Sequence, residues 1–154
     1  MWVRYMDELR GPADQEILEQ SFPSEPVAIG LNDYFVEKDG VRFAGTHLLV
    51  DMWGASNLTD IGVIEKALCD AATAANATIL HVHLKQFTEN GGVSGVLVLA
   101  ESHISIHTWP ERSFAALDIF MCGECDPHLS VPVLEKAFQP KNIELTEQRR
   151  GTLR

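Results

Sequence analysis

The stretch VLVLAESHISIHTWPE, residues 96–111, carries the clearest indications of both the fold and a functional site. An apolar run leads into a carboxylate, a serine and a histidine, and apolar and polar residues then alternate. Successive side chains of a strand point to opposite faces, so His103, Ser105 and His107 are predicted on one face and the isoleucines between them on the other. Polar groups gathered in a half-buried segment are costly unless they are paired or used. The stretch is therefore the first indication of a functional site.

The flanking sequence predicts a sheet with few helices. Alternating or apolar runs predict strands over residues 41–53, 77–87, 93–100, 103–109, 113–121 and 143–148. Helical spacing predicts one helix over residues 59–75, capped by Thr59 or Asn57, and a second that starts near Val131 and is ended by Pro140. The order β-α-β-β-β-β-α-β predicts an α+β fold, a two-layer sandwich with a mainly antiparallel sheet and the helices on one face.

The N-terminal part of the chain differs from the rest. The 154 residues, 45% of them hydrophobic, suffice for one globular domain. Residues 1–40 hold nine acidic and three basic residues, hence −6 of the total net charge of −10. We interpret them as an acidic, partly ordered extension and predict the compact domain at residues 41–154.

Composition argues against several classes of function. A net charge of −10 disfavours binding to a phosphate backbone. No apolar run approaches the roughly 20 residues that span a bilayer, and the N-terminus lacks the plan of a signal peptide. We therefore expect a cytoplasmic protein with no nucleic-acid or membrane partner. Three cysteines, at positions 69, 122 and 125, do not predict a disulfide framework.

The histidines do not predict a metal site. His81 and His83 share one face of a predicted strand, but they lack a third ligand and are interpreted as a polar sheet face. A set made of Glu111 and the histidines of the central stretch is disfavoured because Pro110 interrupts the strand. We expect no bound metal.

Ser102, between Glu101 and His103, is a candidate nucleophile. A hydrolase serine on a nucleophile elbow has glycines around it and leads from a strand into a helix, and neither condition holds here. Another interpretation is that the Ser102 hydroxyl attacks the carbonyl of Glu101, which requires a base and a favourable geometry. A tight turn between two strands can supply that geometry through strain.

Cys122 and Cys125 form a Cys-x-x-Cys motif after an apolar strand. The pair suggests redox chemistry or half of a zinc site, but the second pair of zinc ligands is missing. Glu124 and Asp126 beside these thiols would raise their pKa, whereas a redox thiol needs a lowered one.

Several motifs together carry a family resemblance. They are Gly45–Asp51, Gly92–Gly95, Glu101–His103, Ile106–Glu111 and Asp118–Gly123. In this order they resemble the small prokaryotic S-adenosylmethionine decarboxylases, and the resemblance covers about residues 43–150.

The resemblance implies an inactive proenzyme that cuts itself between Glu101 and Ser102, into residues 1–101 and 102–154. A covalent pyruvoyl group would replace Ser102 as the cofactor, and Ser94 and His107 would assist the processing. The pyruvoyl ketone would form a Schiff base with the amine of S-adenosylmethionine and act as an electron sink for loss of carbon dioxide. Cys122, in a catalytic role alongside Ser102 and His107, would return a proton to the substrate.

The resemblance also implies the substrate-binding residues and the assembly. Phe43 and Phe87 match adenine-stacking positions, and Glu111 matches a carboxylate that binds ribose. The active unit would be a homodimer of cleaved protomers with shared sites, and the product would feed spermidine and other polyamine synthesis. Three alternatives stay open: the same pyruvoyl chemistry on L-arginine or L-ornithine, a non-enzymatic paralogue that never cleaves, and a redox protein.

Overall fold

The computed structural model describes residues 34–153. The predicted acidic extension therefore lies largely outside the described residues. The elements in chain order are β1 (Val36–Lys38), β2 (Val41–Phe43), β3 (Gly45–Trp53), α3 (Ile61–Ala74), β4 (Ile79–Gln86), β5 (Val93–Leu99), β6 (Ser102–Trp109), η1 (Pro110–Arg112), β7 (Phe114–Met121), η2 (Pro127–Leu129), α4 (Ser130–Phe138) and β8 (Asn142–Arg150).

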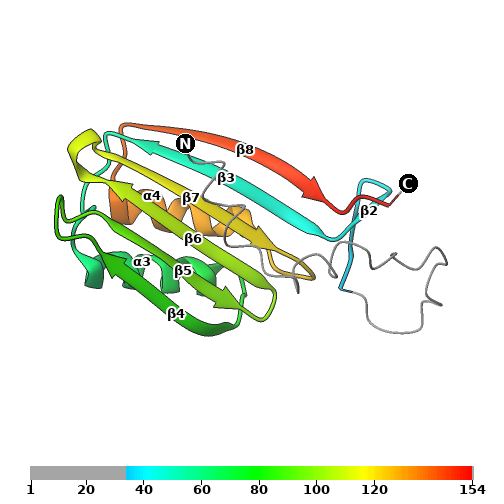
Figure 1. Cartoon of the computed structure of the whole chain (residues 1–154). Helices are drawn as coiled ribbons and strands as arrows, with labels where there is room; N and C mark the ends of the chain where they lie inside the picture. Colours follow the sequence, from blue (N-terminus) through cyan, green and yellow to red (C-terminus); the bar gives the residue numbers. More distant parts are fainter. Residues whose placement is uncertain (1–33, 154) are drawn as a thin grey trace, which may run out of the picture. The chain divides into compact units, whose positions relative to one another are not determined.

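The main sheet has six strands in the order β4-β5-β6-β7-β3-β8, and every neighbouring pair is antiparallel. Helices α3 and α4 pack together on one side of it, behind the sheet in Figure 1. The predicted two-layer α+β fold is confirmed. A separate two-stranded sheet is formed by β1 and β2.

The core lies between the sheet and the helices. On β6 and β7 the apolar residues that alternate with polar ones, such as Ile104, Ile106 and Ile119, are fully buried, as is Leu68 of α3. Burying one such side chain contributes about 1.5–3 kcal/mol. The apolar side chains whose alternation predicted the strands therefore also stabilise the packing of the sheet against the helices.

Helix α3 begins later than predicted. Its N-cap is Asp60, whose carboxylate accepts hydrogen bonds from the N–H groups of Gly62 and Val63. The predicted cap, Thr59 or Asn57, is wrong because the carboxylate one residue further along satisfies the free donors of the first turn. Helix α4 ends at Phe138, before Pro140 as predicted, because the residue preceding a proline avoids helical geometry.

The predicted strand over residues 41–53 is divided at Ala44. Its first part, β2, pairs with β1, whereas β3 enters the main sheet between β7 and β8. Gly45 begins β3 so close to β7 that an added Cβ would lie 2.5 Å from the carbonyl oxygen of Met121. The tight approach permits only glycine at this position.

The sheet face opposite the two helices, here called the open face, carries polar and aromatic side chains. Cross-strand pairing gives it these members, among others: His47, Leu49, Trp53, Val98, His103, Ser105, His107, Trp109, Phe114, Asp118 and Phe120. His81 and His83 lie beside it on edge strand β4, as the polar-face interpretation predicts. Within residues 34–153, no group of three or more His, Cys, Asp or Glu side chains could hold a metal ion. None of the helices described is long and apolar enough to cross a membrane.

Candidate active site

The turn before Ser102 is short and strained. Strand β5 ends at Leu99, which pairs with Ser102 at the start of β6, so only Ala100 and Glu101 connect the strands. Ser102 has a φ of 152°, in a region that residues with a side chain rarely occupy. Such a conformation costs about 1–3 kcal/mol. Strain is therefore stored directly after the peptide bond between Glu101 and Ser102.

The Ser102 hydroxyl lies beside a histidine of its own chain. Ser102 Oγ is 3.3 Å from Nδ1 of His103. Neighbouring residues on a regular strand project to opposite faces, so this contact depends on the unusual backbone of Ser102. Sequence reasoning assigned His103 no role, because alternation alone argues against a contact with its neighbour.

Glu101 is held at two points. Its carbonyl oxygen accepts hydrogen bonds from the backbone N–H of Cys122, at 3.1 Å, and from the Cys122 thiol, at 3.0 Å. Its carboxylate accepts a bond from the N–H of Thr78 at 2.8 Å. Donors aimed at a carbonyl oxygen stabilise the charge that develops when the carbon is attacked. The arrangement suits attack by Ser102 on this carbonyl.

The thiols of the Cys-x-x-Cys motif stay protonated at neutral pH. Burial is the main cause that raises the pKa of Cys122; its backbone hydrogen bond acts in the opposite direction and the charge of Glu101 adds to the rise. Burial also raises the pKa of Cys125, followed by the charges of Glu101, Cys122 and Glu124. The acidic surroundings therefore act in the direction predicted, although burial is the larger cause. A protonated Cys122 can donate a proton and is a poor redox nucleophile.

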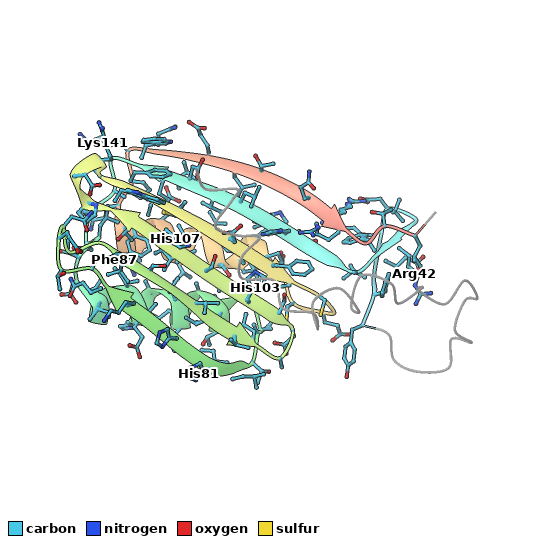
Figure 2. All side chains as sticks on the ribbon, viewed as in Figure 1. Arg42, His81, Phe87, His103, His107 and Lys141 are labelled. Atoms are coloured by element: carbon cyan, nitrogen blue, oxygen red, sulfur yellow. The ribbon has the colours of Figure 1, made fainter. Side chains whose placement is uncertain are left out.

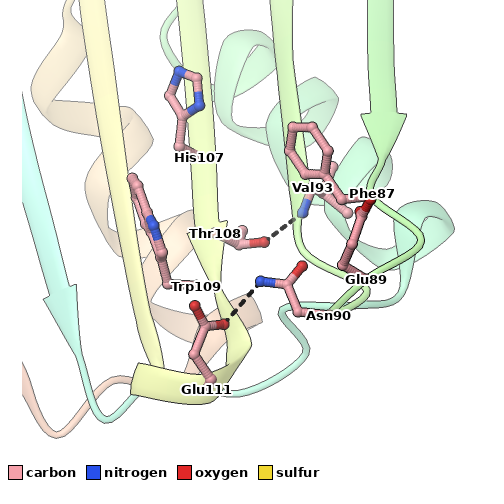
Figure 3. Close-up of a pocket in the computed structure, with 8 residues that line it drawn as sticks. All are labelled: Phe87, Glu89, Asn90, Val93, His107, Thr108, Trp109 and Glu111. Atoms are coloured by element: carbon pink, nitrogen blue, oxygen red, sulfur yellow. Dashed lines mark hydrogen bonds between the residues drawn. The ribbon is translucent and has the colours of Figure 1, made fainter.

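A cavity of about 440 Å³ opens at the far end of β6 (Figure 3). Its walls are Phe87, Glu89, Asn90, Val93, His107, Thr108, Trp109 and Glu111. Three of the residues predicted from the sequence, Phe87, His107 and Glu111, are thus brought together. Phe87 is 48% exposed, so its ring is available to a ligand rather than packed in the core.

Asn90 fixes the carboxylate in this cavity, and sequence reasoning missed it. Its Nδ2 donates to Oε2 of Glu111 at 3.0 Å, the bond drawn in Figure 3, while its Oδ1 accepts from the N–H of Gly92 at 2.9 Å. Gly92 closes the loop onto β6, since an added Cβ would lie 2.7 Å from the carbonyl oxygen of Thr108. The only signal in the sequence was the turn-forming Asn-Gly-Gly, which does not indicate a distant partner.

Ser94 and His107 form a pair that is distant from Ser102 in the same chain. Ser94 Oγ is 3.0 Å from Nδ1 of His107, and the two residues face each other across β5 and β6. His107 lies five positions along β6 from Ser102, which is about 16 Å on an extended strand. Figure 2 shows His103 and His107 at separate places along this strand. The residues predicted to take part in processing therefore fall into two groups within one chain.

Phe43 belongs to neither the cavity nor the open face. It is fully buried on β2, and the guanidinium carbon of Arg149 lies 5.1 Å from its ring centroid. Its predicted partner Phe87 lines the cavity, whereas Phe43 does not. Within one chain, the two predicted stacking residues are thus not brought together.

A carbonyl that accepts two hydrogen bonds beside a serine, together with a mostly apolar cavity that holds an oriented carboxylate, fits the active site of an enzyme. The family model for S-adenosylmethionine decarboxylase matches residues 46–151. The chain therefore belongs to the S-adenosylmethionine decarboxylase family.

Similar proteins agree with this family. A protein of Thermomicrobium roseum called S-adenosylmethionine decarboxylase proenzyme is 41% identical over 114 residues, which cover 73% of this chain and 98% of the relative. One of Methanococcus maripaludis with the same name is 45% identical over 112 residues, 71% of this chain and 91% of the relative. The crystal structure of the adenosylmethionine decarboxylase from Aquifex aeolicus matches with a TM-score of 0.66 and 33% identity, over 73% of this chain and 94% of that one.

Proposed function

We propose that this chain is a proenzyme that cuts itself between Glu101 and Ser102 and then decarboxylates S-adenosyl-L-methionine. The products would be decarboxylated S-adenosylmethionine and carbon dioxide, for spermidine synthesis in the cytoplasm. The observation that carries the proposal is the strained Ser102 after a carbonyl with two donors, in a chain of this family. The same chemistry on L-arginine or L-ornithine is the second candidate.

The residues at the turn fit the formation of a pyruvoyl group. Ser102 supplies the attacking oxygen and Cys122 supplies both donors to the Glu101 carbonyl. The group, once formed at position 102, supplies an electron sink for loss of carbon dioxide. Because burial raises the pKa of Cys122, its thiol carries a proton at neutral pH and can deliver it to the substrate carbon.

The cavity at the other end of β6 fits the adenosine part of the substrate. Phe87 offers a ring face for stacking with adenine, and Glu111 offers acceptors for the ribose hydroxyls. A substrate that lacks adenosine would leave the exposed ring of Phe87 without a stacking partner. This favours S-adenosylmethionine over arginine or ornithine.

The two groups of residues support a homodimer with shared sites. Ser102 and Cys122 at one end of β6 would meet Ser94, His107 and Glu111 of a second copy, because one chain keeps these groups about 16 Å apart. The open face supplies apolar area for such an interface.

Exposed aromatic and aliphatic side chains on the open face support the same assembly. Trp53, Val98 and Trp109 on this face are 42%, 40% and 39% exposed. Trp53 and Trp109 form an aromatic cluster through Phe114, and exposed apolar area of this kind is typical of a surface that is covered in the active assembly.

Intact mass spectrometry tests the self-cleavage. We expect two fragments, 1–101 and 102–154, from the unmodified chain, the second blocked at its N-terminus, and a single uncut chain from Ser102→Ala. A single uncut chain in both preparations would refute the proposal. Release of carbon dioxide from carboxyl-labelled S-adenosylmethionine, arginine or ornithine then identifies the substrate, and Glu111→Gln should weaken use of S-adenosylmethionine alone.

A further inference from the structure

We propose that His103 is the base that accepts the proton of the Ser102 hydroxyl in the first step of self-cleavage. The inference rests on the proposed self-processing and adds to it a residue of the same chain. Its basis is the 3.3 Å separation between Ser102 Oγ and His103 Nδ1. A serine hydroxyl is a weak nucleophile until a neighbouring base takes its proton.

The contact is a consequence of the unusual turn. Ser102 and Leu99 form the last pair of the β5–β6 ladder, and Leu99 is buried with the core. A regular strand would send the Ser102 side chain toward the core and that of His103 toward the open face. The φ of 152° at Ser102 removes this alternation and allows the hydroxyl to reach the imidazole. The strained backbone and the base are thus two parts of one arrangement.

Neighbouring side chains fix the His103 ring. Its centroid lies 5.9 Å from that of Phe120 and 6.3 Å from that of His47, both in edge-on geometry. His47 is itself held, with Nε2 at 3.2 Å from Oδ1 of Asp118 and Nδ1 at 3.2 Å from a guanidinium nitrogen of Arg150. A ring held from its far side can keep Nδ1 directed at Ser102.

The step balances within the chain. His103, with its own proton on Nε2, takes the hydroxyl proton at Nδ1 while Ser102 Oγ bonds to the carbonyl carbon of Glu101. The carbonyl electron pair moves onto the oxygen that the Cys122 N–H and thiol hold. The carbon–nitrogen bond between Glu101 and Ser102 then breaks, and the nitrogen takes the proton back from His103. The product is an ester with a free Ser102 amine, and no other reactant is required.

His107 of the same chain is badly placed for this step. Its Nδ1 is 3.0 Å from Ser94 Oγ, at the distant end of β6. The geometry therefore separates the two histidines, and within one chain only His103 is within reach of the Ser102 hydroxyl.

The test compares three variants with the unmodified chain in a pulse-chase of freshly synthesised protein. His103→Asn keeps an acceptor near the position of Nδ1 but is not basic, and His103→Ala removes both. His81→Ala, a histidine in the same cross-strand row, is the matched control. We expect cleavage at Glu101/Ser102 to slow by about a hundredfold or more in both His103 variants and to be unchanged in the control.

Hydroxylamine at neutral pH identifies the step that fails, because under these conditions it cuts esters far faster than amides, and a cut at position 101 differs in mass from one at the Asn90-Gly91 bond. We expect the uncut His103 variants to resist hydroxylamine, because they form no ester. Added imidazole should partly restore cleavage of His103→Ala.

Three results would overturn the inference: normal cleavage in His103→Asn, accumulation of ester in the His103 variants, or equal slowing in the control. If His103→Ala fails to fold, the cleavage rate of His103→Asn decides the test, provided that this variant has a native circular dichroism spectrum. An uncut unmodified chain would instead refute the proposed self-cleavage as a whole, so the two failures are distinguishable.

Discussion

Mixing two inactive variants should restore activity if the active site is shared between copies. Under the proposed function, Ser102→Ala removes the source of the pyruvoyl group, and His107→Ala removes a histidine proposed to assist the processing. In a mixed dimer, one site receives intact Ser102 and Cys122 from the His107→Ala chain and intact His107 from the Ser102→Ala chain. The other site carries both changes.

The expected activity follows from the structure. Because Ser102 and His107 lie about 16 Å apart along β6, one chain cannot bring them together, and only the mixed dimer has an intact site. With equal coexpression and random pairing, about half of the dimers are mixed, and each has one intact site out of two. We therefore expect about a quarter of the activity of the unmodified protein in the unselected mixture, and about half once the mixed dimers are isolated.

The assay is release of labelled carbon dioxide from coexpressed chains that carry different affinity tags, after purification on both tags. Each variant expressed alone and the two mixed after separate folding serve as controls. Activity no higher than that of the single variants would refute the shared site, as would a His107→Ala protein that is fully cleaved and active alone. Cleavage of only the His107→Ala chain in the mixed dimer would support the assignment independently.

Three further predictions concern single residues. Asn90→Ala should raise the KM for S-adenosylmethionine about five- to tenfold with little change in kcat, because the Glu111 carboxylate loses the hydrogen bond that orients it. Steady-state kinetics on fully cleaved enzyme measures both constants. A fall in kcat alone would contradict this role of Asn90. Cys122→Ala should abolish decarboxylation and slow the self-cleavage, whereas Cys125→Ser should leave both nearly unchanged. Mass spectra measure the cleavage, and carbon dioxide release measures the decarboxylation. Loss of activity in Cys125→Ser would instead favour a redox role for the cysteine pair. Burial raises the pKa of Asp126, but hydrogen bonds from the backbone and ring of His128 outweigh it and hold the pKa below the ordinary value. The ionised carboxylate therefore stabilises the fold above about pH 4, and this contribution is lost as the pH falls through the lowered pKa. In denaturant unfolding between pH 3 and 7, the free energy of unfolding of Asp126→Asn should fall less on acidification than that of the unmodified chain.

Local patterns in the sequence were sufficient to predict the architecture. Alternation around Ile104 and Ile106 predicts both the strand and its buried face, and the spacing of apolar residues up to Leu68 predicts the helix that covers it. These features depend on periods of two and 3.6 residues, which a sequence displays directly. The helix boundaries were less predictable. Asp60 caps the helix, rather than Thr59 or Asn57, because of the conformation of the loop before it, which the sequence does not show.

The site was only partly predictable because its contacts cross the sheet or break the strand pattern. The bond from Asn90 to Glu111 joins residues 21 positions apart, and sequence gives no sign of it. The contact between Ser102 and His103 contradicts the alternation that located the strand. The buried position of Phe43 results from pairing between short strands and from a distant arginine, which no local pattern indicates.

The strand order decides what cleavage does to the molecule. A cut after Glu101 leaves β3, β4 and β5 on the first fragment and β6, β7 and β8 on the second. In the sheet, β3 lies between β7 and β8, and β6 lies between β5 and β7. The two fragments are therefore interleaved by hydrogen-bonded ladders and can be separated only by unfolding.

This interleaving would make the proposed cleavage irreversible for folding as well as for chemistry. Before the cut, the chain refolds as a single molecule, with the short turn keeping β5 and β6 close. After the cut, the same sheet must be assembled from two polypeptides, at a rate that depends on their concentration. Under the proposed cleavage, a mature molecule that unfolds no longer has the covalent link that first brought its strands together, so its lifetime would depend on the rate of unfolding.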